Sequence, residues 1–342
     1  MLKPLAAIAA AAFLSAALFL AVIGGTLGAV ILAYMAPLPL YVLGLAKGFR
    51  SAAIAAAVSG LAIALAAASP LAGLGFIGAV GLPAAILMQR ALLARQDPGG
   101  GDLEWYPTGL LSLWWCGLAA VAMVAGAVLL GDGDIQGTVR DLLDESLTFW
   151  LRGMDNPAVT ARQPEMVAMM APSFPAMVAV SWALMHALNA ILAQGLLVRF
   201  GRNLRPSPKL AAVDLPKPAL AALVACAVGG MVLPGDIGYL ASNLVIIAAL
   251  PYFIAGLGLA HAAAARTGWP TAWLVALYFG LITMMTWMAP ALVVAGVADQ
   301  WLGLRARLAG TNRPPRGGPP SGTPPTAKIE DDSVDPNDRP RD

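Results

Sequence analysis

The chain of 342 residues has few of the groups on which enzymes usually depend. It contains two histidines, two cysteines and only 12% charged residues. Cys116 and Cys226 lie in apolar segments, with no partner at metal or redox spacing, so we interpret them as small hydrophobes. There is no P-loop, no His-Glu-x-x-His motif and no recognisable Ser/His/Asp set. These absences argue against an enzyme, and we expect no metal, no cofactor and no nucleic-acid partner.

Carboxylates are also missing from the middle of every long apolar run. A proton-coupled carrier generally uses an acid buried within the membrane, and ATP hydrolysis requires a phosphate-binding loop. If this chain takes part in active transport, another subunit must therefore supply the energy.

What the chain does contain is apolar sequence, with 59% hydrophobic residues and many runs of about 18 residues or more. This pattern predicts an all-α, polytopic transmembrane helical bundle over residues 1–307 with about eight membrane segments, nine or ten being the alternatives. The apolar runs are 5–23, 27–45, 51–68, 70–95, 110–130, 174–200, 218–233, 237–262 and 269–297. The protein is expected to sit in the lipid bilayer of a bacterial inner membrane.

The second run is interrupted by Pro37 and Pro39. Two prolines one residue apart cannot both sit inside a regular helix, since each lacks a backbone N–H and crowds the preceding turn. Broken backbone at membrane depth persists only when it is packed in protein or lines a cavity. The break therefore predicts a functional interior.

The charges outside the apolar runs indicate an orientation. Residues 131–172 are rich in acids, and the apolar residues within this region predict an amphipathic helix lying along the surface: Leu142, Leu143, Leu147, Phe149, Trp150 and Leu151. Basic residues follow several runs and lie near the end of the last one. Because basic loops favour the cytoplasmic face, we expect the N-terminus and the C-terminal tail inside and 131–172 outside. Nine crossings would place the two termini on opposite faces of the membrane. Either a short run therefore does not cross, or the last run makes two passes. We favour eight crossings. The Pro-rich tail, 308–342, is expected to be disordered.

Polar side chains within the runs are the candidate ligand-binding residues. Trp182, His186 and Asn189 share one helical face in the sixth run. Tyr239 and Asn243 lie one turn apart in the eighth, and the two groups are hypothesised to meet at one cavity. The alternative is that these side chains bond to neighbouring helices.

Several short motifs resemble the YybS-type family of predicted bacterial membrane proteins. They are Pro37-Leu38-Pro39-Leu40, Gly44, Lys47-Gly48-Phe49-Arg50, Asn243, Ala255-Gly256-Leu257, Gly296-Val297-Ala298-Asp299-Gln300-Trp301 and Leu304-Arg305-Ala306-Arg307. The resemblance covers most of residues 1 to 307 and implies a polytopic membrane protein.

That family is in turn similar to the substrate-capturing S components of energy-coupling-factor vitamin transporters. In S components, small residues four apart on an early helix dock onto a transmembrane coupling subunit, which works with ATPases. Ala6/Ala10 and Ala12/Ala16 have this spacing here. The resemblance implies a component that binds a small, vitamin-like molecule and relies on such partners for energy. The alternative is a structural or assembly protein that acts through protein–protein contacts.

Overall fold

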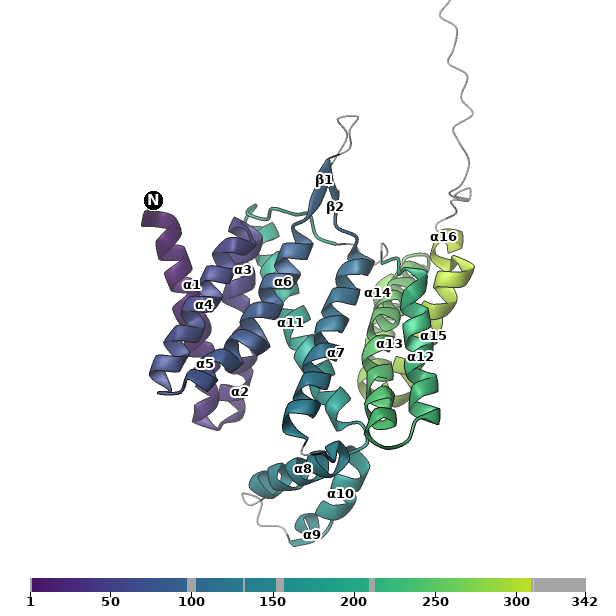
Figure 1. Ribbon diagram of the computed structural model, residues 1–342. Coiled ribbons are helices and arrows are strands. Elements are labelled where there is room, and N and C mark those ends of the chain that lie inside the picture. Colours follow the sequence, from purple (N-terminus) through teal and green to yellow (C-terminus); the bar gives the residue numbers. More distant parts are fainter. Residues whose placement is uncertain are drawn as a thin grey trace, which may run out of the picture.

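In a computed structural model, the protein is almost entirely helical, and the structure describes residues 2–96, 103–131, 133–151, 157–208, 213–308 and 310 (Figure 1). In chain order the elements are α1 Leu2–Leu20, η1 Ala21–Gly24, α2 Leu27–Tyr34, α3 Leu38–Lys47, α4 Phe49–Ala66, α5 Pro70–Phe76, η2 Ile77–Gly81, α6 Leu82–Ala91, β1 Ala94–Gln96, β2 Leu103–Trp105, α7 Thr108–Leu130, α8 Ile135–Leu151, α9 Pro157–Thr160, α10 Gln163–Met170, α11 Phe174–Arg199, α12 Lys217–Val232, α13 Gly235–Ala264, α14 Pro270–Thr283, α15 Met285–Leu302 and α16 Leu304–Leu308. The all-α prediction is confirmed, with one addition: the short antiparallel hairpin β1–β2 forms between the fourth and fifth apolar runs.

The helices form two groups joined by a central pair (Figure 1). The first group is α1 to α6, and the second is α12 to α16. Helix α11 packs against α3 and α7, and α7 packs against α13, so these two helices connect the groups. The hairpin lies at one end of the bundle, and α8 to α10 lie at the opposite end.

Within the described residues, seven helical stretches are long and apolar enough to cross a membrane. They include 27–47, in which α2 and α3 together make one broken span, and 70–91, which combines α5, η2 and α6. Two shorter apolar helices, α12 and α14, lie in the second group. The chain is thus a polytopic membrane protein, as the sequence predicts.

The last apolar run is not a single helix but reverses at Met284, between α14 and α15. Leu277 and Leu292 pack in one cluster with Ala260. They are 292 − 277 = 15 residues apart, about 22 Å along a continuous helix, so the two helices must fold back on each other. The reversal places α16 at the same end as the β1–β2 hairpin and the N-terminus (Figure 1). This fold-back is the geometry that two passes of the last run would require, but within the described residues neither α14 nor α15 is among the seven stretches long and apolar enough to cross, so the number of crossings stays a prediction.

Helices α13 and α15 cross closely because two glycines face each other's backbone. A Cβ atom on Gly256 would lie 2.0 Å from the carbonyl oxygen of Leu292. One on Gly296 would lie 2.0 Å from the carbonyl oxygen of Tyr252. Both glycines belong to motifs that carry the family resemblance, and here they are packing positions.

The motifs at 296–301 and 304–307 hold the segment after α11 against the end of α15. Asp299, only 4% exposed, forms an ion pair with Arg305. The Arg305 guanidinium also donates to the carbonyl of Val213 at 2.6 Å, and the amide of Leu215 donates to Gln300 at 3.0 Å. These residues therefore hold 213–215 against the bundle.

The two ends of the bundle differ in charge. The predicted amphipathic helix in the acidic region is present as α8, which packs against α10 through Leu143 and Val167. The basic residues that follow α3, α6, α11 and α15 lie at the end that carries the hairpin (Figure 1). Of the expected disordered tail, 308–342, residues 309 and 311–342 lie outside the described residues, and Leu308 is the last residue of α16.

Candidate functional site: an apolar cavity beside a polar network

The break between α2 and α3 is buried, and its carbonyls are bonded to side chains from other helices. Pro37 and Pro39 are both buried. Ser15 Oγ donates to the carbonyl of Ala36 at 2.6 Å, and Asn189 Nδ2 donates to that of Tyr34 at 2.7 Å. Inside a membrane, a carbonyl without a backbone donor needs another hydrogen-bond donor, because lipid tails supply none. Both of these carbonyls have such a donor.

A second break lies in the span that contains α5 and α6. Pro83 has no N–H to offer the carbonyl of Ala79, four residues before it, and η2 (Ile77–Gly81) is a π-helical stretch. Trp182 Nε1 donates to this carbonyl at 2.7 Å, and His186 Nε2 lies 3.0 Å from it. Two of the candidate ligand residues therefore contact one proline-freed carbonyl.

The His186 ring is held on both sides. Since the Ala79 carbonyl can only accept, Nε2 carries the proton in the bond to it, and Nδ1 of the neutral ring is left as an acceptor. The hydroxyl of Tyr41, 3.0 Å away, then donates to Nδ1. The Trp182 ring packs beside the imidazole, with centroids 4.5 Å apart. This network fixes α11 against α3 and η2.

Asn189 satisfies the backbone but is not itself fully satisfied. Its Nδ2 donates to the carbonyls of Tyr34 and Met185, both at 2.7 Å. Its Oδ1 is buried without a hydrogen-bond donor. Asn189 does not line the cavity described below.

Tyr239 and Asn243 hold a different place, the start of α11. The Tyr239 hydroxyl donates to the carbonyl of Ala171 at 2.6 Å. Asn243 Nδ2 donates to the carbonyl of Pro172, and its Oδ1 accepts from the amide of Ala176, both at 3.0 Å. Asn243 thereby bonds one of the free amides of the first helical turn.

The two predicted groups therefore do not meet at one cavity. His186 follows Ala176 by ten residues along α11, about 15 Å of helix. The hydrogen bonds of both groups go to backbone atoms or to Tyr41, and Asn189 Oδ1 forms none. This is the alternative in which the polar groups bond to neighbouring helices.

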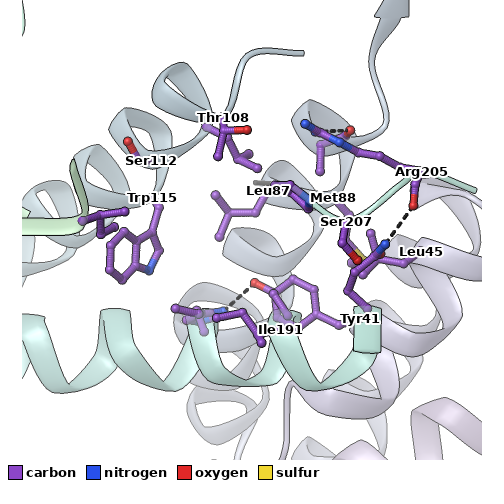
Figure 2. A pocket seen from close by; sticks show the side chains of 18 of the residues that line it. Tyr41, Leu45, Leu87, Met88, Thr108, Ser112, Trp115, Ile191, Arg205 and Ser207 are labelled. Carbon is purple, nitrogen blue, oxygen red and sulfur yellow. Dashed lines mark hydrogen bonds between the residues drawn. The ribbon is translucent and has the colours of Figure 1, made fainter. Parts of the chain in front are cut away.

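A cavity of about 530 Å³ lies beside His186, at the end of the bundle that carries the hairpin (Figure 2). Its walls come from α3, α6, α7, α11 and α13 and from the segment after α11. The lining includes aromatic, apolar, small and polar side chains: Tyr41, Leu87, Met88, Thr108, Ser112, Trp115, His186, Ala190, Gln194, Gly195, Arg205 and Ser207. Its surface is almost wholly apolar, and its volume suits a drug-sized molecule.

The space exists because α11 has small residues on the face that lines the cavity. Ala187, Ala190 and Gly195 lie on the wall together with Ile191 and Gln194, at spacings of three and four. A Cβ on Gly195 would meet no atom within 4 Å. Larger side chains at these positions would project into the cavity.

Arg205 is the one charged residue of the lining within the described part of the chain. It is 7% exposed, and its Nη1 and Nη2 atoms donate to the carbonyls of Ala91 and Tyr106, at 2.8 and 2.9 Å. Gln194 Nε2 donates to the Arg205 carbonyl at 2.8 Å and fixes its backbone. Burial lowers the pKa of Arg205, although a guanidinium remains charged at neutral pH.

The four alanines expected to dock a partner divide into two pairs. Ala12 and Ala16 are buried in the core, and the Ala12 carbonyl accepts from Ser59 of α4. The docking hypothesis is therefore wrong for this pair, because α4 already covers it. Ala6 and Ala10 are exposed and remain a prediction.

The sequence singled out His186 but missed most of the cavity wall. Tyr41, Trp115 and Arg205 come from three separate stretches, and no local pattern connects them. Among the described residues, no three His, Cys, Asp or Glu side chains gather as a metal site would require.

Comparison with known proteins identifies a family for this chain. The model of a family described as a predicted membrane protein (DUF2232) matches residues 11–300. No curated protein and no solved structure matches the chain.

Proposed function

This chain belongs to the DUF2232 family of predicted membrane proteins, and we propose that it is a binding component that captures a small molecule in the cavity beside His186. The cavity itself carries the proposal: a bundle of packed helices leaves about 530 Å³ open where α11 contributes the small residues Ala187, Ala190 and Gly195 to the wall. Well-packed interiors contain few voids larger than a water molecule, so a space of this size suggests a ligand. The proposed role is non-enzymatic.

We propose further that the component works with an energy-coupling membrane subunit and ATPases, since the sequence offers no nucleotide-binding motif of its own. Purification from native membranes in mild detergent, followed by mass spectrometry of the copurifying proteins, tests this part. Recovery of a membrane subunit together with ATPases supports it. Recovery of envelope proteins without any ATPase would overturn it.

Native mass spectrometry of the purified protein tests the binding role. Ala190→Phe and Gly195→Phe place an aromatic ring on the cavity wall, and they should abolish a bound mass that the unmodified protein carries. Ala122→Phe and Gly117→Phe are the matched controls, since both positions are on α7, exposed and outside the cavity lining. Retention of the bound mass in all four variants would contradict binding in this cavity.

A second candidate function is assembly, and the observation that favours it is the surface of α8. Phe149 and Trp150 are 71% and 58% exposed at the acidic end of the bundle. Exposed aromatics of this kind mark an interaction surface or the membrane interface. The double substitution Phe149→Ser/Trp150→Ser should then remove copurifying proteins without changing the occupancy of the cavity.

We propose that the end of the bundle with the hairpin faces the cytoplasm of a bacterial cell, because basic residues gather there. Labelling with a membrane-impermeant maleimide tests this orientation. Glu145→Cys on α8 should react in intact cells, whereas Arg202→Cys should react only after the cells are permeabilised. The reverse pattern would invert the orientation.

A further inference from the structure

We propose that the molecule captured in the cavity is an amphipathic anion, with its apolar body among α6, α7 and α11 and its acidic group at Arg205. This inference rests on the proposed binding role and names the class of ligand. It starts from the contrast between a nearly apolar wall and one buried guanidinium at its edge. Figure 2 shows Arg205 and Ser207 together at that edge, away from Trp115.

The charge of Arg205 has no protein counter-ion within the described residues. The two ion pairs found there are Arg95–Glu104 and Arg305–Asp299. Asp214, in the segment that also contributes to the wall, is exposed and forms no such pair. A buried charge without a partner is costly, so a site of this kind favours an anion that can enter it.

Carbonyl groups offset only part of the charge. Ala91 is the last residue of α6, and the free carbonyls of a helix C-terminus amount to about half a negative charge. The Tyr106 carbonyl adds a neutral dipole. The guanidinium has five N–H groups, and the hydrogen bonds to these two carbonyls use two of its nitrogens, which leaves donor capacity for a ligand.

The surroundings add a second positive charge. Arg90 lies at the same end of α6, with its guanidinium carbon 4.2 Å from the centroid of the Trp114 ring and its Nε buried without an acceptor. The Trp105 ring lies 5.9 Å from the Arg205 guanidinium. The hydroxyls of Thr108 and Ser207 are the neutral donors on the same part of the lining. This arrangement recognises a carboxylate or a phosphate and disfavours a cation.

The apolar part of the wall defines the other half of the ligand. Leu87, Met88, Leu111 and Trp115 line the body of the cavity, and two polar groups beside them, Tyr41 and His186, already bond to each other. A small hydrophilic anion would leave this surface without contacts. An acid with an alkyl or aromatic body would bury it, at about 25 cal/mol per Å² of apolar area.

A binding assay on the full chain in neutral-lipid nanodiscs tests the inference, with radiolabelled dodecanoate as the probe and dodecyl phosphate, dodecanol and dodecylamine as competitors. Both anions should bind at least tenfold more tightly than the alcohol, and the amine should be the weakest. Arg205→Gln should remove the preference for anions and leave the affinity for dodecanol unchanged. Arg95→Gln, which removes an exposed charge at the same end, should change neither.

The outcomes separate this inference from the proposed function. Dodecanol binding that equals dodecanoate binding and is blocked by Gly195→Phe would overturn the anion and leave the binding role standing. Lack of binding by every probe would overturn both. If Arg205→Gln fails to fold, Arg205→Lys, which keeps the charge, should retain the anion preference. The comparison of acid with alcohol in the unmodified protein decides the question in any case.

Discussion

Substitution of Gly296 by alanine should separate α13 from α15 and destabilise the second helix group. The added Cβ would lie 2.0 Å from the carbonyl oxygen of Tyr252 and 2.9 Å from the amide nitrogen of Gly256. Both neighbours are backbone atoms, so neither can rotate away as a flexible side chain would. Overpacking of this kind costs about 1–3 kcal/mol. Gly256→Ala meets the Leu292 carbonyl at 2.0 Å and should cost a similar amount.

The double variant makes the prediction sharper. Once one Cβ has forced the helices apart, the second finds part of its space already made, so Gly256→Ala/Gly296→Ala should cost less than the sum of the singles. Thermal unfolding in detergent, followed by fluorescence-detected size exclusion, gives the ranking. Gly126→Ala on α7 is the control, because nothing lies within 4 Å of its added Cβ. A Gly296→Ala variant as stable as this control would refute the reasoning, as would strictly additive losses.

Two further substitutions test the polar contacts. Asn189→Leu leaves the partly buried Tyr34 carbonyl without its side-chain donor, so it should lower the stability by about 1–3 kcal/mol while the cavity keeps its ligand in native mass spectrometry. Asp299→Asn breaks a buried ion pair with Arg305 and should cost about 3–5 kcal/mol, seen as faster hydrogen exchange next to α15. Glu104→Gln, in an exposed pair, should change the stability by less than about 1 kcal/mol.

The sequence was informative where a residue type dictates the backbone. Pro37 and Pro39 predict the break in the second span and its burial, because proline cannot continue the hydrogen-bond pattern and lipid cannot replace it. The helix 135–151 follows in the same way from its amphipathic pattern. Such features depend on neighbours in the chain, which the sequence displays directly.

Features that depend on contacts between distant residues were not predictable. Two passes of the last run were one expected alternative, but no proline or glycine marks the place of the reversal at Met284, where α14 and α15 both pack against α13. The bonds from Trp182 and His186 to Ala79 need a specific pairing of α11 with η2. The one local signal available for this contact is Pro83, which cannot donate to the Ala79 carbonyl. The separation of His186 from Tyr239 and Asn243 also depends on a distant contact, because Asn243 of α13 meets α11 at Ala176, ten residues before His186.

The cavity was missed for the same reason. Its main signal is small residues at one face of α11, and alanine and glycine are so common in this chain that the pattern does not stand out. Arg205 is one of several basic residues after α11, and only the structure separates it from those at the surface.

The most direct test of the account is a cryo-electron microscopy map of the full chain purified from native membranes without added lipid. We predict elongated non-protein density that fills the cavity between Trp115 and Tyr41 and ends within hydrogen-bonding distance of the Arg205 guanidinium. A well-resolved map in which neighbouring side chains fill this space, or in which it holds no density, would contradict the claim that the cavity is a ligand site.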